Sequence, residues 1–196
     1  MSSDTTQSNL KSTRDRLTEA MIRVIGSEGM HAASVRTIAR EAGCNEAVLY
    51  QHFPSKAAMQ EAIYEDIVSE MAEEKRLLAT TGNDVRTFIR SWIEVTFRNY
   101  DQRPDAFAYA LLSFPPVVRS ENPISDVQSR IFIDALASLS PPNGFRVRND
   151  SIAIAIFRST LLGIPYEIHM KRLDGPASDY ATDVARMAES IILQPI

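Results

Sequence analysis

Residues 34–56 read SVRTIAREAGCNEAVLYQHFPSK, and this stretch decides the fold. Its first half carries apolar residues at the spacing i, i+3, i+4 and i+7, which places them on one face of a helix, namely Val35, Ile38, Ala39 and Ala42. Ser34 stands at the capping position, where its hydroxyl accepts from first-turn amides that lack a partner. Gly43 can adopt the left-handed geometry that ends a helix. One short helix is therefore framed on both sides.

A second short helix follows after a tight turn. Asn45 is its expected cap, and Pro54 ends it because proline disfavours helical geometry in the residue before it. Val48 and Leu49 point back toward the first helix. The outward side consists of Glu46, Ala47, Tyr50, Gln51 and His52. Two short helices joined in this way predict a helix-turn-helix.

The same stretch resembles the DNA-binding signature of TetR-family transcriptional regulators. The residues that carry the resemblance are IAREAG at 38–43, LYQHF at 49–53 and SK at 55–56. The upstream helix, expected to begin at Ser12 or Thr13 and to stop at Gly29, fits as well. The resemblance implies an all-α fold, in which an N-terminal three-helix helix-turn-helix domain precedes a larger helical domain for effector binding and dimerisation.

The resemblance also implies which residues meet DNA. The second helix of such a motif lies in the major groove, and a dimer presents two of them about 34 Å apart. The implied contact residues are Ser34, Arg36, Asn45, Glu46, Ala47, Tyr50, Gln51, His52 and Lys56. We expect Tyr50, His52 and Lys56 to bind phosphates, and Gln51 and Asn45 to pair with adenine edges. The expected partner is a palindromic or near-palindromic double-stranded operator.

Two positions depart from the usual family pattern. The family often has a glycine where Ala47 stands and a serine or threonine where Asn45 stands. The extra methyl of Ala47 predicts a slightly withdrawn docking. Glu46 would repel phosphate unless it accepts from a cytosine N4. The operator sequence therefore stays open.

Length and charge divide the chain into three segments. We expect a polar arm at 1–11, the DNA-binding domain at 12–56 and the helical ligand-binding and dimerisation domain at 57–196. The net charge is −4, but residues 1–60 hold seven Lys and Arg against six Asp and Glu. The remainder holds fourteen against nineteen. This asymmetry favours DNA contact at the N-terminal end.

The sequence favours a cytoplasmic protein. No apolar run approaches the ~20 residues that span a bilayer, and the N-terminus has no apolar core like that of a signal peptide. Cys44 is the only cysteine, which excludes an intrachain disulfide. It is either a redox switch or, as we favour, a small residue packed under the turn.

Aromatic residues gather between 84 and 116, where Asp84 opens one helix and Pro104 starts another. An apolar ligand pocket there would be lined by Trp92, Phe97, Tyr100, Phe107 and Phe114. Its candidate polar anchors are Arg158, Tyr166 and His169. The alternative is that these aromatics at helical spacing form ordinary core.

The last two helices are candidates for a dimer interface. A strongly apolar helix from about Asn149 to Ile168 is expected to be buried on more than one face. The final helix carries a stripe of mostly small residues, Ala181, Ala185, Ala188 and Ile192. By resemblance these two helices would form a four-helix bundle across a two-fold axis. The alternative is a monomer with a wide buried helix.

No catalytic constellation stands out in the sequence. The three histidines lie far apart, and there is no Gly-rich phosphate loop and no GxSxG. We therefore expect no enzyme activity, no metal and no cofactor. The prediction is a homodimeric repressor released from its operator by a small, largely apolar effector. The alternative is a helical ligand carrier or enzyme that keeps the helix-turn-helix only as structure.

Overall fold

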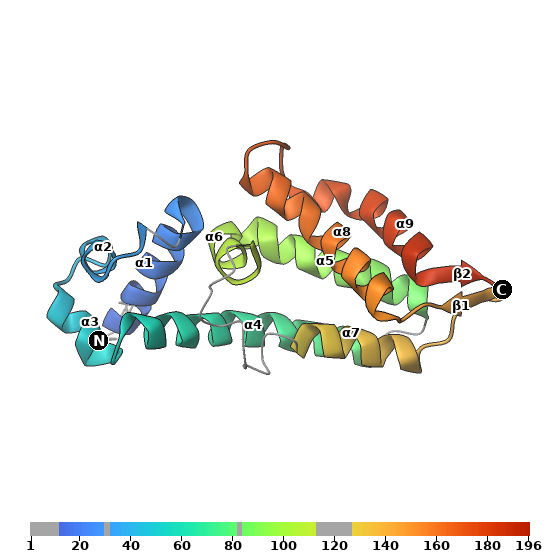
Figure 1. Cartoon of the computed structure of the whole chain (residues 1–196), viewed down its shortest axis with the longest axis horizontal. Helices are drawn as coiled ribbons and strands as arrows, with labels where there is room; N and C mark the ends of the chain where they lie inside the picture. The colour runs from blue at the N-terminus through green and yellow to red at the C-terminus, as the bar shows by residue number, and fades with distance from the viewer. Residues whose placement is uncertain (1–11, 30–31, 82–83, 113–126) are drawn as a thin grey trace, which may run out of the picture.

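A computed structural model describes residues 12–29, 32–81, 84–112 and 127–196. The described chain is helical apart from two short strands, as the sequence predicts (Figure 1). The first three helices sit at one end of the long helix α4 (Lys56–Thr81), and the helices that follow form a larger body along the rest of it. The polar arm expected at residues 1–11 lies outside the described residues.

The first three helices begin at the caps that the sequence predicts. Helix α1 (Thr13–Glu28) starts at Ser12, whose hydroxyl accepts from the Asp15 amide at 3.1 Å. The Asp15 carboxylate in turn accepts from the Ser12 amide, which completes a capping box. Helix α1 ends at Gly29, which has a φ of +82°. Helices α2 (Val35–Glu41) and α3 (Glu46–His52) follow.

The larger helical body surrounds a core continuous with that of the first three helices. It contains α5 (Val85–Gln102), α6 (Pro104–Phe107), the π-helix η2 (Ala108–Leu112) and α7 (Val127–Ser138). It is completed by α8 (Ser151–His169), the 3-10 helix η4 (Ala177–Tyr180) and α9 (Ala181–Ile192). Helix α5 packs against α4, α8 and α9.

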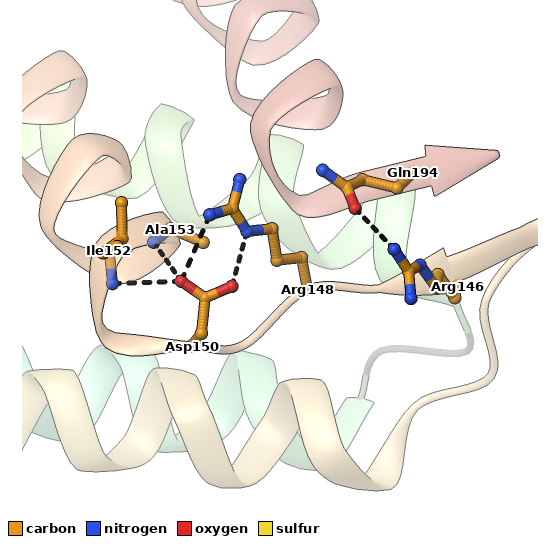
Figure 2. A network of polar contacts seen from close by, with 6 residues as sticks. All are labelled: Arg146, Arg148, Asp150, Ile152, Ala153 and Gln194. Carbon is orange, nitrogen blue, oxygen red and sulfur yellow. Dashed lines mark hydrogen bonds and ion pairs between the residues drawn. The ribbon is translucent and has the colours of Figure 1, made fainter.

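Two short strands, which the sequence reasoning did not predict, fasten the C-terminal end to the start of α8. Strand β1 (Phe145–Val147) pairs antiparallel with β2 (Leu193–Pro195). Figure 2 shows the polar contacts beside this pair. Arg148 pairs with Asp150, and Asp150 caps α8 by accepting from the amides of Ile152 and Ala153 at 3.1 and 3.0 Å.

Helix α8 corrects one expectation. It is buried on one face only, which consists of Ala153, Phe157, Leu161 and Pro165. On the opposite side Ile152 is 60% exposed and Ile156 is 44% exposed. Within the described ranges α8 is the one helix long and apolar enough to cross a membrane, by length and composition alone. Apolarity on all sides thus does not mean burial within one protomer.

Helices α1 and α6 touch closely. A Cβ added at Gly26 would lie 2.8 Å from the Cα of Asp105 in α6, which is closer than side chains pack. The π-helix η2 follows α6 directly, and the Tyr109 hydroxyl donates to the backbone oxygen of Gln60 in α4 at 2.7 Å. The segment 104–112 therefore joins the first three helices to the larger helical body.

Candidate nucleic-acid interface and ligand cavity

The outer face of α3 is an exposed polar surface. Leu49 is fully buried against α1 and α2, which fixes the rotation of the short helix about its axis. Tyr50 is 53% exposed. The other exposed side chains of the predicted contact set are Ser34, Arg36, Asn45, Glu46, Ala47, Gln51 and His52. Lys56, at the start of α4, is half-buried.

Two of the predicted contact residues are also helix caps. The Ser34 hydroxyl accepts from the Thr37 amide at 3.0 Å. The Oδ1 of Asn45 accepts from the Val48 amide at 3.0 Å. Because reading an adenine edge takes both the oxygen and the nitrogen of the amide, the Asn45 oxygen would have to accept from the base with its second lone pair while it caps α3 with the first. Its free Nδ2 is a donor, which suits a phosphate oxygen or a base acceptor.

Two arginines of α1 hold the helix-turn-helix together, a role that the sequence reasoning missed. The Arg16 guanidinium donates to the backbone oxygen of Ala42 at 2.7 and 3.1 Å and to that of Gly43 at 3.2 Å. The Arg14 guanidinium lies 4.4 Å from the centroid of the Phe53 ring. These contacts bridge the ends of α2 and α3, so the outer face of α3 is displayed by a rigid unit.

Cys44 lies in this turn, partly buried and packed against the core. Its amide donates to the backbone oxygen of Ala39 at 2.9 Å. Its place matches that of a small residue packed under the turn.

A cavity of about 100 Å³ lies inside the larger helical body. It is bounded by α4, α5, η2, α7 and α8. Its wall is mostly apolar and is formed by Tyr64, Val68, Lys75, Trp92, Thr96, Leu111, Gln128, Ser129, Phe132, Ile154, Phe157, Arg158, Leu161 and Leu162. Three aromatic rings are in contact here. The ring centroids of Trp92 and Phe132 lie 5.0 Å apart, and those of Phe132 and Phe157 lie 4.2 Å apart.

The structure brings two of the eight predicted ligand residues, Trp92 and Arg158, to this cavity. Phe97, Tyr100 and Phe107 are buried elsewhere in the core, so the core interpretation describes them better. The reason is that helical spacing identifies the buried face of a helix without saying which part of that face borders a void. Phe114 lies outside the described residues.

The other two predicted anchors do not line the cavity. Tyr166 is 41% exposed, and the Arg172 guanidinium lies 5.4 Å from the centroid of its ring. His169 is half-buried at the C-terminal end of α8. Both lie beyond the part of α8 that borders the cavity, which runs from Ile154 to Leu162.

The polar members that sequence reasoning missed are Lys75 and Gln128. Lys75 is 2% exposed, and its Nζ donates to Oε1 of Gln128 at 2.8 Å. Burial lowers the pKa of Lys75 to about 7, an effect that the carboxylate of Glu74 opposes. Burial also raises the pKa of the Tyr64 hydroxyl. The cavity thus has one ionisable group that titrates near neutral pH.

The predicted dimer residues point inward. Ala185, Ala188 and Ile192 are buried within the protomer, on the side of α9 that meets α5 and α8, and Ala181 is half-buried. This placement corrects the choice of face, because small residues also suit close packing within one chain. Apolar residues that are exposed on these helices include Ile152 and Ile156 of α8 and Met187 of α9, which is 59% exposed. We call these three residues the apolar face.

Across the described ranges, no group of three or more His, Cys, Asp and Glu side chains is placed to hold a metal ion.

Comparison with known proteins finds relatives for the N-terminal part of the chain. Residues 17–63 match the family model described as "Bacterial regulatory proteins, tetR family". The HTH-type transcriptional regulator BetI of Pectobacterium carotovorum subsp. carotovorum (strain PC1) is 34% identical over 86 residues. That match covers 43% of this chain and 44% of BetI. The chain therefore spans less than half the length of this curated relative.

Solved structures resemble the whole fold. The fatty acid degradation regulator FadR from Bacillus halodurans is similar with a TM-score of 0.67 at 15% identity, over 92% of this chain and 96% of that one. FadR from Bacillus subtilis, solved in complex with stearoyl-CoA, has a TM-score of 0.61 at 14% identity, over 91% and 98% of the two chains. At such identities the likeness concerns the fold.

Proposed function

We propose that this chain, a member of the tetR family of bacterial regulatory proteins by its N-terminal domain, is a dimeric transcriptional regulator. It binds a palindromic or near-palindromic operator in the cytoplasm and acts as a repressor that a small, largely apolar effector releases. The observation that carries the proposal is the exposed outer face of α3, held rigid by Leu49 and Arg16. A helix presented in this way fits the major groove.

The cavity supports the effector part of the proposal. Its wall is mostly apolar with a few polar groups, which is the usual composition of a small-molecule site. FadR from Bacillus subtilis, a chain of similar fold, was solved in complex with stearoyl-CoA, a ligand with a long apolar acyl chain. An effector that prefers the conformer with the wrong spacing of recognition helices weakens DNA binding, and DNA weakens effector binding by the same factor.

The segment 104–112 is the proposed connection between cavity and DNA. Leu111 lines the cavity, Tyr109 of the same π-helix is bonded to α4, and α6 sits on Gly26 of α1. An effector that displaces Leu111 would therefore move α6, and with it the surface on which α1 packs. Such a movement changes the distance between the two α3 helices of a dimer.

Gly26→Ala tests this connection. The added methyl meets the backbone of Asp105, so α1 must move away from α6. We expect operator affinity to fall by about tenfold, which corresponds to about 1.4 kcal/mol. Fluorescence anisotropy with labelled operator DNA measures the change. The matched control is Ser27→Ala at the exposed neighbouring position; equal affinities for the two variants would count against the connection.

Ile156→Glu tests the dimer. The apolar face lies on neighbouring helices α8 and α9, and a charge within it would be buried on association. We expect the variant to fold normally and to sediment as a monomer, with a dimer dissociation constant raised by about a hundredfold or more. The control is Leu77→Glu, at a leucine of α4 that is 66% exposed. If Leu77→Glu dissociates the dimer and Ile156→Glu does not, the interface lies elsewhere.

The function itself is tested with the DNA upstream of the chain's own gene and of its neighbours. Binding is titrated across salt, because each neutralised phosphate releases counterions and steepens the salt dependence. Specific, salt-sensitive binding by a dimer would support the regulator. Binding that is absent or indifferent to sequence would instead favour the alternative, a helical carrier or enzyme that keeps the motif as structure.

A further inference from the structure

Lys75 is a buried cation in the wall of the cavity. Its ammonium lies 4.5 Å from the centroid of the Trp92 ring and donates one hydrogen bond, to Gln128. In the part of the chain that the structure describes, no carboxylate forms an ion pair with it. Glu74 directly precedes Lys75 in α4, but its side chain is exposed. Its carboxylate lies 4.0 Å from the guanidinium of Arg98. A buried ammonium without a counter-ion is unusual, since such groups are normally paired.

Gln128 adds a second unmet donor at the same place. Its Oε1 is taken by Lys75, and its Nε2 is buried without any hydrogen-bond partner. An ammonium carries three protons and a side-chain amide nitrogen carries two. The pair therefore presents more donors than acceptors to the cavity. A buried donor left without an acceptor is costly, so the site favours a ligand that brings acceptors.

The rest of the wall limits what that ligand can be. Val68, Leu111, Phe132 and Leu161 supply an apolar surface next to the polar pair. The hydroxyl of Thr96 already donates to the backbone oxygen of Trp92 at 2.8 Å. A fitting ligand therefore has a small, acceptor-rich head and an apolar remainder.

We propose that the cavity binds the anion of an apolar carboxylic acid, whose two oxygens accept from Lys75 Nζ and Gln128 Nε2. This assignment rests on the proposed function only in naming the acid as the effector. A carboxylate fits because it brings two acceptors and the missing negative charge, and charge-assisted bonds are the stronger ones. An alcohol brings one acceptor and no charge. An amine would place a second cation beside the first.

Binding of an anion here is coupled to a proton. The empty cavity holds the pKa of Lys75 at about 7, and a bound carboxylate favours the charged form and raises that pKa. The other charged or titratable groups facing the cavity are Arg158 on α8, Tyr64 on α4 and, beside Lys75, Glu74. Burial raises the pKa of the Tyr64 hydroxyl, whereas it lowers that of Lys75 to about 7. The complex should take up a proton, and affinity should fall as pH rises above 7.

Trp92 provides a direct measurement, because it is the only tryptophan and lines the cavity. Its fluorescence is followed while hexanoate, octanoate or decanoate is added, and then octan-1-ol or octylamine. At least one acid should bind ten times more tightly than the alcohol, and the amine should bind more weakly still. Lys75→Met should remove the preference for the acid while keeping the alcohol affinity. Lys171→Met, the same exchange at an exposed position, should change nothing.

Calorimetry in two buffers with different ionisation heats gives a second readout. At pH 7.5 octanoate binding to the wild-type protein should take up a fraction of a proton, and Gln128→Leu should weaken binding with this uptake retained. Equal affinity for acid and alcohol, no binding of any acid, or unchanged acid affinity in Lys75→Met would each overturn the proposal.

The operator experiment stays separate from the ligand experiment. Operator affinity is measured for the wild type and Lys75→Met without any acid. If the wild type and the variant both bind operator and no acid binds, the proposed acid site is wrong and the proposed regulatory function is supported. If the acid binds as described and the operator DNA does not, the proposed acid site is supported and the proposed regulatory function is wrong.

Discussion

Tyr50→Ala combined with Lys56→Ala is expected to abolish specific operator binding. Both residues are predicted phosphate contacts, and the structure places Tyr50 on the outer face of α3, with Lys56 just beyond it at the start of α4. Ser55 caps α4 by accepting from the Ala58 amide at 3.0 Å, so the first turn of α4 is ordered where Lys56 begins it. A phosphate there meets both the lysine and the unpaired amides of the helix start.

The expected loss is large because a dimer makes each contact twice. Four contacts are removed, and at about 1 kcal/mol each this predicts a loss of at least a hundredfold. The salt dependence should also become shallower by about two counterions, one for each Lys56 of the dimer. Anisotropy titrations at several salt concentrations measure both quantities.

The control for this variant is Leu77→Ala with Lys171→Ala. It also removes one large exposed side chain and one lysine, but at positions far from α3. It should leave operator affinity and salt dependence unchanged. Because Tyr50 is exposed and Lys56 only half-buried, thermal unfolding of the double variant should stay close to that of the wild type. Retained operator affinity in a folded dimer would show that these residues are not the contacts.

The features that could be predicted from sequence are those with local causes. Ser12, Ser34, Asn45 and Asp84 all cap helices as expected, because a cap bonds to an amide two or three residues further on. The glycine at position 43 has a φ of +69°, as a turn between two short helices requires. The exposed side of α3 followed from the same short-range patterns, whereas the fold class was implied by the family resemblance.

The cavity could not be predicted, because its causes are distant in sequence. Lys75 follows two glutamates in a strongly acidic helix, a pattern typical of a solvated face. Its burial depends on Trp92 and Gln128, which come from two other helices. Nothing in the sequence likewise indicates that Arg16 donates to the backbone oxygens of Ala42 and Gly43. Packing partners decided these cases, and hydrophobic spacing carries no information about them.

The choice of dimer face failed for a related reason. Helix α9 has apolar residues on two neighbouring stripes, and the pattern says only that both avoid water. In the structure Ala185 and Ala188 are buried in the protomer core, whereas Met187 is exposed. Spacing cannot distinguish an intramolecular neighbour from a second copy, because the same apolar contact satisfies both.

Lys75→Met is expected to stabilise the empty protein at neutral pH, and to do so by a few kcal/mol when it is combined with Gln128→Leu. In the unfolded chain Lys75 has its ordinary pKa, whereas in the folded protein burial lowers the pKa to about 7. The folded state therefore holds the proton less tightly, and that difference is a cost of folding. The cation–π contact with Trp92 recovers about 2 kcal/mol. Several pKa units at about 1.4 kcal/mol each outweigh it.

The pH dependence identifies the cause of this stabilisation. Between pH 7 and the unfolded pKa the unfolded state binds more protons than the folded state, so the wild type gains stability as pH rises. The methionine variant lacks this gain. The difference in free energy of unfolding should therefore be greatest at pH 6.5, where both states of the wild type are largely protonated, and should shrink steadily toward pH 9.5.

Gln128 complicates the size of the effect, but not its pH dependence. Methionine leaves both polar atoms of the Gln128 amide without a partner, at a cost of about 1–3 kcal/mol. Lys75→Met with Gln128→Leu removes that cost and should be the most stable of the three proteins. Denaturant unfolding at pH 6.5 and 9.5 measures all of them. A wild type that is more stable than both variants at pH 6.5 would mean that the ammonium has a counter-ion, and the cavity would then need no acid to complete it.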